Sequence, residues 1–240
     1  MRAVQVHGDV RRAAPPAAAR IRGLNLLIVF VKQPRPGAAK TRLIPALGAE
    51  RAAELYRLLA EEEIRQTTAR AGEYERLFFH APPEASLADW LPGETLLPQD
   101  GDDLGARMSA AFDEAFRRGA RRVAIVGTDA PFVSRDTVLE AFRSLDLHDL
   151  VLGPAHDGGY YLLAVDRPRP SLFQGIAWST PAVLAATVER AGTLGLTVRL
   201  LEPLRDIDTL DDLRAEKARL EPLLARAPGL AAAVARALEG

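Results

Sequence analysis

The sequence predicts an α/β protein with a doubly wound, mostly parallel sheet and helices on both faces. Two unbroken apolar runs, at residues 26–31 and 123–126, are typical of strands that are buried on both sides in a parallel sheet. Segments of strand character alternate with amphipathic segments that are long enough for helices, which favours crossover connections. With 48% hydrophobic residues in a chain of 240, a sizeable core can form.

The first half of the chain is expected to open the sheet and supply two long helices. Strands are predicted at residues 26–31 and 76–80, with a short one at 94–97. A helix is predicted from about Ala49, and its apolar residues at helical spacing are Ala52, Leu55 and Leu59. Another helix is predicted from about Asp103, and its inward face would carry Leu104, Met108, Ala111 and Ala115.

The second half continues the alternation. Strands are predicted at residues 123–126, 149–153, 160–165 and 197–201. One helix would turn four residues inward: Val138, Ala141, Phe142 and Leu145. Further helices are predicted over residues 181–191, from Thr209 and through the Ala-rich stretch 230–238. At Thr209 the spacing to Asp212 resembles a capping box with Asp in place of Glu.

Composition limits the classes of protein that fit. Residues 1–23 lack apolar bulk and periodicity, and we predict a mobile N-terminal extension there, followed by one domain over 24–240. A net charge of −1 predicts no nucleic-acid partner. The absence of cysteine excludes disulfides and thiolate metal sites, and no apolar run is long enough to span a membrane. We expect a cytoplasmic protein of undetermined oligomeric state.

The segment Gly127-Thr128-Asp129-Ala130-Pro131 follows the second buried strand directly. Ligands of open α/β sheets bind outside the carboxyl ends of the strands, so Asp129 is placed to carry a metal ion onto a phosphate. The alternative is an aspartate that only turns the chain.

The loop after the first strand, residues 32–43, carries four cations: Lys32, Arg35, Lys40 and Arg42. It leads towards a helix, so backbone N–H groups and cationic side chains could meet one anion there. Pro34 and Ala39 stand where a Walker A loop needs glycine, which excludes that motif. Lys40 and Arg42 could converge in an extended loop, and the alternative is a basic, solvated surface.

Asp206 and Asp208 form a third candidate site. In an extended segment both side chains would point to the same side, and two carboxylates there suit a hard cation. Helix capping and favourable charge at the helix N-terminus are the competing explanation.

Two further loops have weaker signals. Residues 153–161 hold paired glycines that permit a close approach to a ligand, or an ordinary hairpin turn. Residues 99–107 place acidic groups at a helix start, which capping alone could explain.

Taken in order, these motifs resemble one known family. The chain is similar to the bacterial glycosyltransferase-like family related to the 2-phospholactate guanylyltransferases, the CofC-like group. The residues that carry the resemblance are Pro36-Gly37-x-x-Lys40-Thr41-Arg42-Leu43, Asp103-Leu104-Gly105-x-Arg107-Met108, Gly127-Thr128-Asp129-x-Pro131, Gly153-Pro154-x-x-Asp157-Gly158-Gly159-Tyr160, Trp178-Ser179-Thr180 and Asp206-Ile207-Asp208-Thr209.

The resemblance implies the GT-A fold of the nucleotide-diphospho-sugar transferases and a set of site residues. Lys40, Arg42 and Asp129 would be catalytic. Asp129 and Asp208 would bind Mg²⁺ or Mn²⁺, with Asp206 as a third candidate. The nucleotide would contact Gly37, Lys40, Thr41, Arg42, Asp103, Gly105 and Arg107. The acceptor would contact Asp157, Gly158, Gly159, Tyr160, Trp178, Ser179 and Thr180.

The function expected from these residues is magnesium-dependent transfer from a nucleotide-activated substrate. The first choice is nucleotidyl transfer from an NTP to a small phosphorylated or carboxylated acceptor. The alternatives are glycosyl transfer from an NDP-sugar, for which the usual Asp-x-Asp motif is missing at residues 127–131, and nucleotide binding without catalysis. We also expect Asp129 and Asp208 to lie close enough to share one divalent ion, and mutual repulsion to raise the pKa of one of them.

Overall fold

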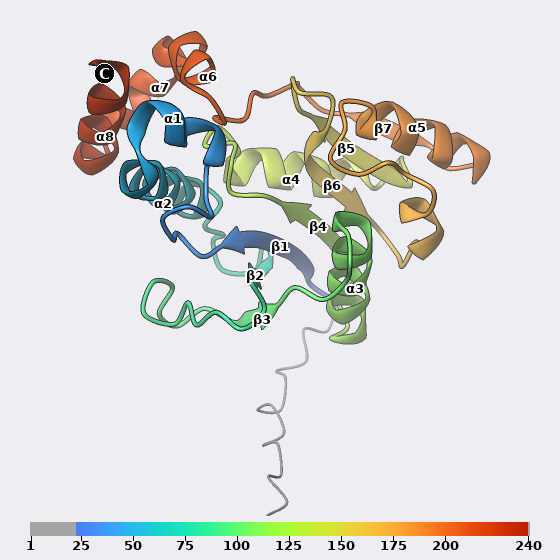
Figure 1. Cartoon of the computed structure of the whole chain (residues 1–240). Helices are drawn as coiled ribbons and strands as arrows, with labels where there is room; N and C mark the ends of the chain where they lie inside the picture. The colour runs from blue at the N-terminus through green and yellow to red at the C-terminus, as the bar shows by residue number, and fades with distance from the viewer. Residues whose placement is uncertain (1–22, 240) are drawn as a thin grey trace, which may run out of the picture.

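The computed structural model describes residues 23–239, so the extension predicted for residues 1–23 lies, apart from Gly23, outside the described residues. The core of the fold is a sheet of seven strands in the order β3-β2-β1-β4-β6-β5-β7 (Figure 1). The strands are β1 (Asn25–Lys32), β2 (Glu75–Ala81), β3 (Leu96–Pro98), β4 (Arg122–Val126), β5 (Leu150–Pro154), β6 (Tyr160–Val165) and β7 (Val198–Leu200).

The sheet is mostly parallel, as predicted. Strand β1 pairs in parallel with β2 and with β4, β2 with β3, and β5 with β7. Strand β6 is antiparallel to both of its neighbours, β4 and β5. It returns from β5 through the turn at residues 155–159, so the Asp-Gly signal in that loop did mark a hairpin.

Helices cover both faces of the sheet. The helices are α1 (Ile44–Leu47), α2 (Ala49–Gln66), α3 (Leu104–Arg117), α4 (Arg135–Ser144), α5 (Val183–Thr193), α6 (Leu210–Ala215), α7 (Lys217–Leu224) and α8 (Pro228–Glu239), with the 3₁₀ turns η1 (Thr41–Leu43) and η2 (Pro170–Phe173). One core joins the sheet to α2 and α4, and a second joins its other face to α3, η2 and α5. Alternation along β1 explains this division, because Leu27 and Val29 belong to the first core and Leu26 and Ile28 to the second. The doubly wound α/β fold is therefore confirmed.

A third apolar cluster lies beside the sheet. Leu220 of α7 and Leu230 and Val234 of α8 pack with Leu55 and Leu59 of α2. Figure 1 shows α6, α7 and α8 gathered next to α1 and α2 at one end of the molecule. This cluster fixes the end of the chain against the helix that follows the first loop.

The order of the strands places the predicted loops together. After β1 the chain builds outward through β2 and β3, and it then returns to add β4 on the other side of β1. The loops after β1 and β4 therefore flank the point where the strand order reverses, which is where ligands bind in open α/β sheets.

One expectation about packing is wrong. Leu104 was predicted on the inward face of its helix with Met108, Ala111 and Ala115, and those three are buried, but Leu104 is 41% exposed. It is the first residue of α3, and it lines the cleft described below because the helix starts at the rim of that cleft.

Candidate active site

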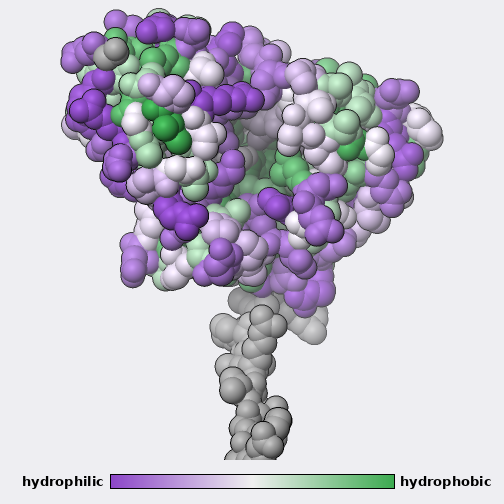
Figure 2. Space-filling model, in the orientation of Figure 1, coloured by the Kyte–Doolittle hydropathy of each residue, from purple (hydrophilic) through white to green (hydrophobic). Residues whose placement is uncertain are grey.

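A cleft runs along the carboxyl edge of the sheet. It consists of two adjoining cavities of about 570 and 600 Å³, which share Lys32, Leu104, Asp129, Tyr160, Ser179 and Asp206 as lining residues. Figure 2 shows the surface hollowed here, with hydrophilic residues around the rim. The volume suits a nucleotide-sized ligand.

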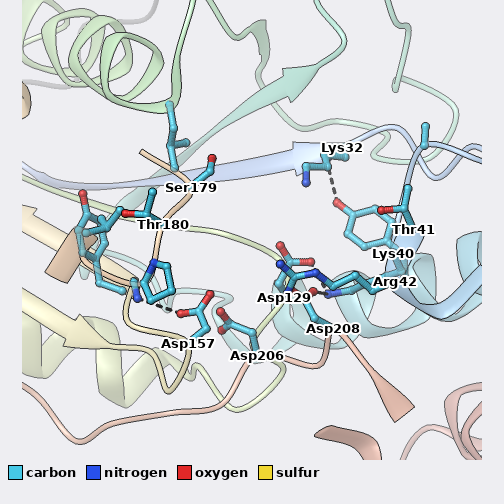
Figure 3. A pocket seen from close by; sticks show the side chains of 17 residues that line it. Lys32, Lys40, Thr41, Arg42, Asp129, Asp157, Ser179, Thr180, Asp206 and Asp208 are labelled. Atoms are coloured by element: carbon cyan, nitrogen blue, oxygen red, sulfur yellow. Dashed lines mark hydrogen bonds and ion pairs between the residues drawn. The ribbon is translucent and has the colours of Figure 1, made fainter. Parts of the chain in front are cut away.

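Two remote carboxylates meet at one cation in this cleft. The Nζ of Lys40 donates a hydrogen bond to Oδ1 of Asp129 at 2.5 Å and another to Oδ1 of Asp208 at 2.9 Å (Figure 3). Asp129 and Asp208 are 79 positions apart in the sequence. The expected proximity of these two carboxylates is therefore present, with an ammonium group between them.

The Asp129 loop is held by the face of α2 beneath it. The hydroxyl of Tyr56 bonds Thr128 Oγ1 at 2.9 Å, Oε2 of Glu63 accepts from the N–H of Ala130 at 3.1 Å, and Gln66 donates to the carbonyl of Pro131. Thr128 also donates to the carbonyl of Phe30, so the loop is bonded to the end of β1 as well. These contacts fix Asp129 although it lies outside any strand.

The segment that carries Asp206 and Asp208 is extended, as the alternation predicted. The N–H of Ile207 donates to the carbonyl of Asp129 at 2.9 Å, and the Ile207 side chain is fully buried in the third apolar cluster. Both aspartates consequently face the cleft. Just after them the predicted capping box is confirmed, since Thr209 and Asp212 bond each other reciprocally at the start of α6.

The first loop brings Lys40 inward and leaves Arg42 outside. Lys40 has left-handed backbone angles (φ 48°, ψ 47°), and its side chain is 2% exposed. The side chain of Arg42 is 70% exposed, and NH1 lies 3.6 Å from Oδ2 of Asp208. Lys40 and Arg42 thus converge on one carboxylate, but not in the extended loop that was expected: Lys40 precedes the 3₁₀ turn η1, and Arg42 lies within it.

Burial and charge set the ionisation of this cluster. Burial disfavours the charged form of Lys40, but the charges of Asp129 and Asp208 outweigh it and raise its pKa. Burial acts to raise the pKa of Asp129, yet Lys40 and then Lys32 hold it below its usual value. Repulsion was expected to raise the pKa of one aspartate of this pair, and it does not do so at Asp129, because the charge of Lys40 outweighs it.

The raised pKa belongs to Asp206 instead. Burial, followed by the charges of Asp129 and Asp157, raises it to about 7. In Figure 3 the carboxylates of Asp157 and Asp206 point towards each other. This part of the cleft has more negative charge than Lys40 neutralises.

The cleft contains side chains with oxygen atoms that could bind a metal ion. Carboxylate oxygens suit Mg²⁺ or Mn²⁺. Among residues 23–239, however, no three acidic or histidine side chains form a group that could hold a metal by itself. Asp129 and Asp208 fit a divalent ion as a pair, and Mg²⁺ commonly binds one or two carboxylates together with substrate phosphates.

The predicted acceptor residues lie along the β5–β6 hairpin and the segment before α5. Asp157, Gly159, Tyr160, Ser179 and Thr180 line the cleft, and Trp178 lines the adjoining cavity. Ser179 has a left-handed backbone with φ 61°.

Gly158 has a packing role in this region. Its φ is +91°, and a Cβ there would lie 2.0 Å from the carbonyl oxygen of Pro181. The glycine therefore lets the hairpin and the segment before α5 close on each other.

Of the other residues predicted to bind the nucleotide, some line the cleft and others have a role in packing or in the backbone conformation. Thr41, Asp103 and Arg107 line the cavities, and Asp103 also caps α3 by accepting from Ala106 N–H. A Cβ on Gly105 would meet the Trp178 ring at 2.3 Å, so that glycine makes room for the indole. Gly37 has φ +82°, and a Cβ there would meet no other atom. Glycine is therefore favoured at this position by its backbone conformation and not by a lack of space.

Comparisons with known proteins identify the family and the fold of the chain. The family described as "Uncharacterized protein conserved in bacteria (DUF2064)" matches residues 63–180. A crystal structure from Desulfovibrio desulfuricans G20, described as a "putative nucleotide-diphospho-sugar transferase", is 30% identical with a TM-score of 0.80, over 90% of this chain and 98% of that one. The chain belongs to the DUF2064 family.

Two other proteins that this DUF2064 chain resembles are named as nucleotidyltransferases. A phosphoenolpyruvate guanylyltransferase from Chloroflexus aggregans (strain MD-66 / DSM 9485) is 29% identical over 181 residues, covering 72% of this chain and 87% of that protein. The inositol-1-phosphate CTP transferase from T. maritima has a TM-score of 0.55 at 12% identity, over 82% of this chain and 95% of that one, which shows a shared fold. The predicted resemblance and the GT-A-type fold are confirmed, and the DUF2064 protein is a transferase.

Sequence reasoning missed the support beneath the site. Tyr56 and Glu63 are 1% exposed and lie seven residues apart in α2, on the face that also buries Ala52 and Leu59. A carboxylate at helical spacing within a buried face was the signal that could have found Glu63. Burial, with added repulsion from Asp129, raises the pKa of Glu63 well above its usual value.

Proposed function

We propose that this protein is a divalent-metal-dependent nucleotidyltransferase that acts on an NTP and a small phosphorylated or carboxylated acceptor. The observation that carries the proposal is the meeting of Asp129 and Asp208 at one cation, in a cleft at the switch point of the sheet. The similarity to a guanylyltransferase whose named substrate, phosphoenolpyruvate, is both phosphorylated and carboxylated supports the type of acceptor.

In the proposed reaction an oxygen of the acceptor attacks the α-phosphorus of the NTP. A bond forms between that oxygen and phosphorus, the bond from phosphorus to the bridging oxygen breaks, and pyrophosphate leaves. An acceptor phosphate or carboxylate is already ionised at neutral pH, so no base has to remove a proton. The remaining requirements are positioning and charge neutralisation.

The cleft residues would divide this task. Asp129 and Asp208 would hold the divalent ion, which would neutralise phosphate charge when bound. Arg42 is exposed to the cleft and Lys32 lines both cavities, so these cations would contact phosphate or acceptor oxygens. Ser179 and Thr180 would place hydroxyl donors beside an acceptor on the hairpin side.

Glycosyl transfer from an NDP-sugar is the second candidate. It is favoured by the 30% identity to the D. desulfuricans structure and disfavoured by the single acidic residue at positions 127–131. Asp206 and Asp208 do supply an Asp-x-Asp spacing, on a different loop from the one expected.

The products of the reaction distinguish the candidates. The protein is incubated with Mg²⁺, each of the four NTPs and phosphoenolpyruvate or another phosphorylated or carboxylated acceptor, and separately with NDP-sugars. We expect pyrophosphate release that requires an acceptor and is abolished in Asp129→Ala. The matched control, Asp113→Ala on the exposed side of α3, is expected to keep full activity.

Release of NDP from an NDP-sugar would reject nucleotidyl transfer in favour of glycosyl transfer. Binding of nucleotide with no product from any combination would indicate a non-catalytic nucleotide-binding protein.

A further inference from the structure

Lys40 is an unusual counter-ion for an open ligand cleft. Its side chain is 2% exposed, whereas the side chains of its partners Asp129 and Asp208 are 38% and 37% exposed. A ligand can therefore reach the carboxylates from the cleft while the ammonium remains behind them. The chain has only two other lysines, Lys32 and Lys217, so Lys40 can be studied without interference from many similar groups.

A divalent ion and this ammonium compete for the same oxygens. Oδ1 of Asp129 and Oδ1 of Asp208 both accept a hydrogen bond from the Nζ of Lys40, at 2.5 Å and 2.9 Å. These two oxygens therefore lie close enough together to bind one ion. An ion that used both oxygens would lie beside a full positive charge unless Lys40 moved. Repulsion between the two cations would then oppose binding of the ion alone.

A nucleotide removes this conflict. Its phosphates offer Lys40 new anionic partners at the moment the carboxylates are lost. Lysine is suited to such an exchange because its charge is compact and its four-carbon stem is flexible.

We propose that Lys40 is an exchangeable counter-ion, and that the cleft takes a divalent cation only as a metal–nucleotide complex. The inference rests on the proposed function for the identity of the ligand. It goes further in that it specifies the form in which the metal enters and the residue that imposes that form.

The test compares the binding of metal alone in three full-length proteins. Affinity for Mn²⁺ is measured by calorimetry without nucleotide in wild type, in Lys40→Met and in Lys217→Met, an exposed lysine on α7 that controls for the side-chain exchange. Methionine fills a similar volume without charge. We expect Lys40→Met to bind free Mn²⁺ at least about tenfold more tightly than the other two, which corresponds to about 1.4 kcal/mol.

A second readout is thermal stability. Loss of the ammonium leaves Asp129 and Asp208 without their counter-ion, so Lys40→Met should melt at a lower temperature than wild type. Mn²⁺ alone should restore that loss, and it should shift wild type and Lys217→Met very little. Equal Mn²⁺ affinity and equal thermal shifts in all three proteins would overturn the proposal.

If Lys40→Met does not fold, the wild-type protein alone decides. We expect its affinity for Mn²⁺ to rise at least about tenfold when GTP or CTP is present in excess over free metal. Tight binding of Mn²⁺ in the absence of nucleotide would overturn the inference. These measurements report metal binding and do not depend on turnover. The result for Lys40 and the result for pyrophosphate release are therefore independent, and either proposal can be rejected while the other stands.

Discussion

Two residues hold backbone conformations that are costly for them. Lys40 and Ser179 are the non-glycine residues with positive φ within the described part of the chain, and both line the cleft. A left-handed conformation costs a residue with a Cβ about 1–2 kcal/mol. Such strain is retained where the surrounding structure imposes it, most often at functional sites. The strained backbone conformations therefore mark the same cleft that the charged side chains mark.

At the residue scale, Arg42 provides a test of the first loop. We expect Arg42→Ala to weaken nucleotide binding by about 10- to 100-fold, because a charge-assisted phosphate contact contributes about 1.5–3 kcal/mol. Its side chain is 70% exposed, so the melting temperature should hardly change. Calorimetric titration with nucleotide and Mg²⁺ measures the first effect and a thermal scan the second. The control is Arg51→Ala, an exposed arginine on α2. Unchanged affinity in Arg42→Ala would make this loop a solvated surface.

Gly158 allows the packing of the hairpin to be tested against a matched glycine. Gly158 and Gly175 both have positive φ, at +91° and +74°, but only Gly158 has a backbone atom where a Cβ would lie. Gly175→Ala should cost about 1–2 kcal/mol from backbone strain alone. Gly158→Ala should cost clearly more, because the Pro181 carbonyl must also move. Urea unfolding of the two variants measures the difference, and equal losses would show that the hairpin and the segment before α5 adapt freely.

At the element scale, α2 is the support of the site. Tyr56, Glu63 and Gln66 lie on one face of it, and each bonds a different residue of the loop that carries Asp129. The same helix packs against α8 through Leu55 and Leu59 of the third apolar cluster. Helix α2 therefore connects the C-terminal helices to the Asp129 loop, which makes the position of that loop depend on the whole end of the molecule.

A surface ion pair ties the turn before β2 to the start of α4. Both oxygens of Glu73 accept from Arg135, at 2.7 and 2.8 Å. The hydrogen bond from Arg135, together with the N–H of Arg70, lowers the pKa of Glu73 to about 2. Because this folded-state pKa lies below the unfolded one, the pair stabilises the fold above the ordinary glutamate pKa and loses that contribution as pH falls towards 2.

We therefore expect Glu73→Gln to be less stable than wild type at pH 7, with the difference shrinking as pH is lowered from about 4.5 towards 2. Urea midpoints at pH 7, 4 and 3 would measure it, with Glu75→Gln, an exposed carboxylate nearby, as the control. A difference that stays constant over this range would show that the ionised form of Glu73 contributes nothing.

At the scale of the whole molecule, the topology of the sheet explains which parts of the fold and of the site could be predicted from the sequence. Strands are recognisable from apolar runs, and parallel strands end at one edge, so the meeting of the Asp129 and Asp208 loops followed from local patterns. The path of Lys40 did not follow, because its left-handed backbone and its burial depend on both loops being in place. For the same reason the sequence did not predict that the charge of Lys40 would outweigh burial and lower the pKa of Asp129. Leu104 was misplaced because helical periodicity indicates a face of the helix but not where the core ends.

The same dependence on tertiary structure applies to β6 and to the support of the site. The antiparallel direction of β6 is set by its pairing with both β4 and β5, which local sequence does not specify. Glu63 and Tyr56 lie on a helix face that sequence reasoning treated as ordinary core. Their hydrogen bonds to the Asp129 loop and the end of β1 depend on where the sheet places that face.

The central claim is that Asp129 and Asp208 bind one divalent ion together with a nucleotide. The most direct measurement is a crystal structure with Mn²⁺ and a non-hydrolysable NTP analogue, in which anomalous scattering locates the metal. We predict one Mn²⁺ coordinated by both carboxylates and by phosphate oxygens, with the ammonium of Lys40 moved from between the carboxylates onto a phosphate. A metal bound elsewhere, or a nucleotide seated with Lys40 still bonded to both aspartates, would contradict the account.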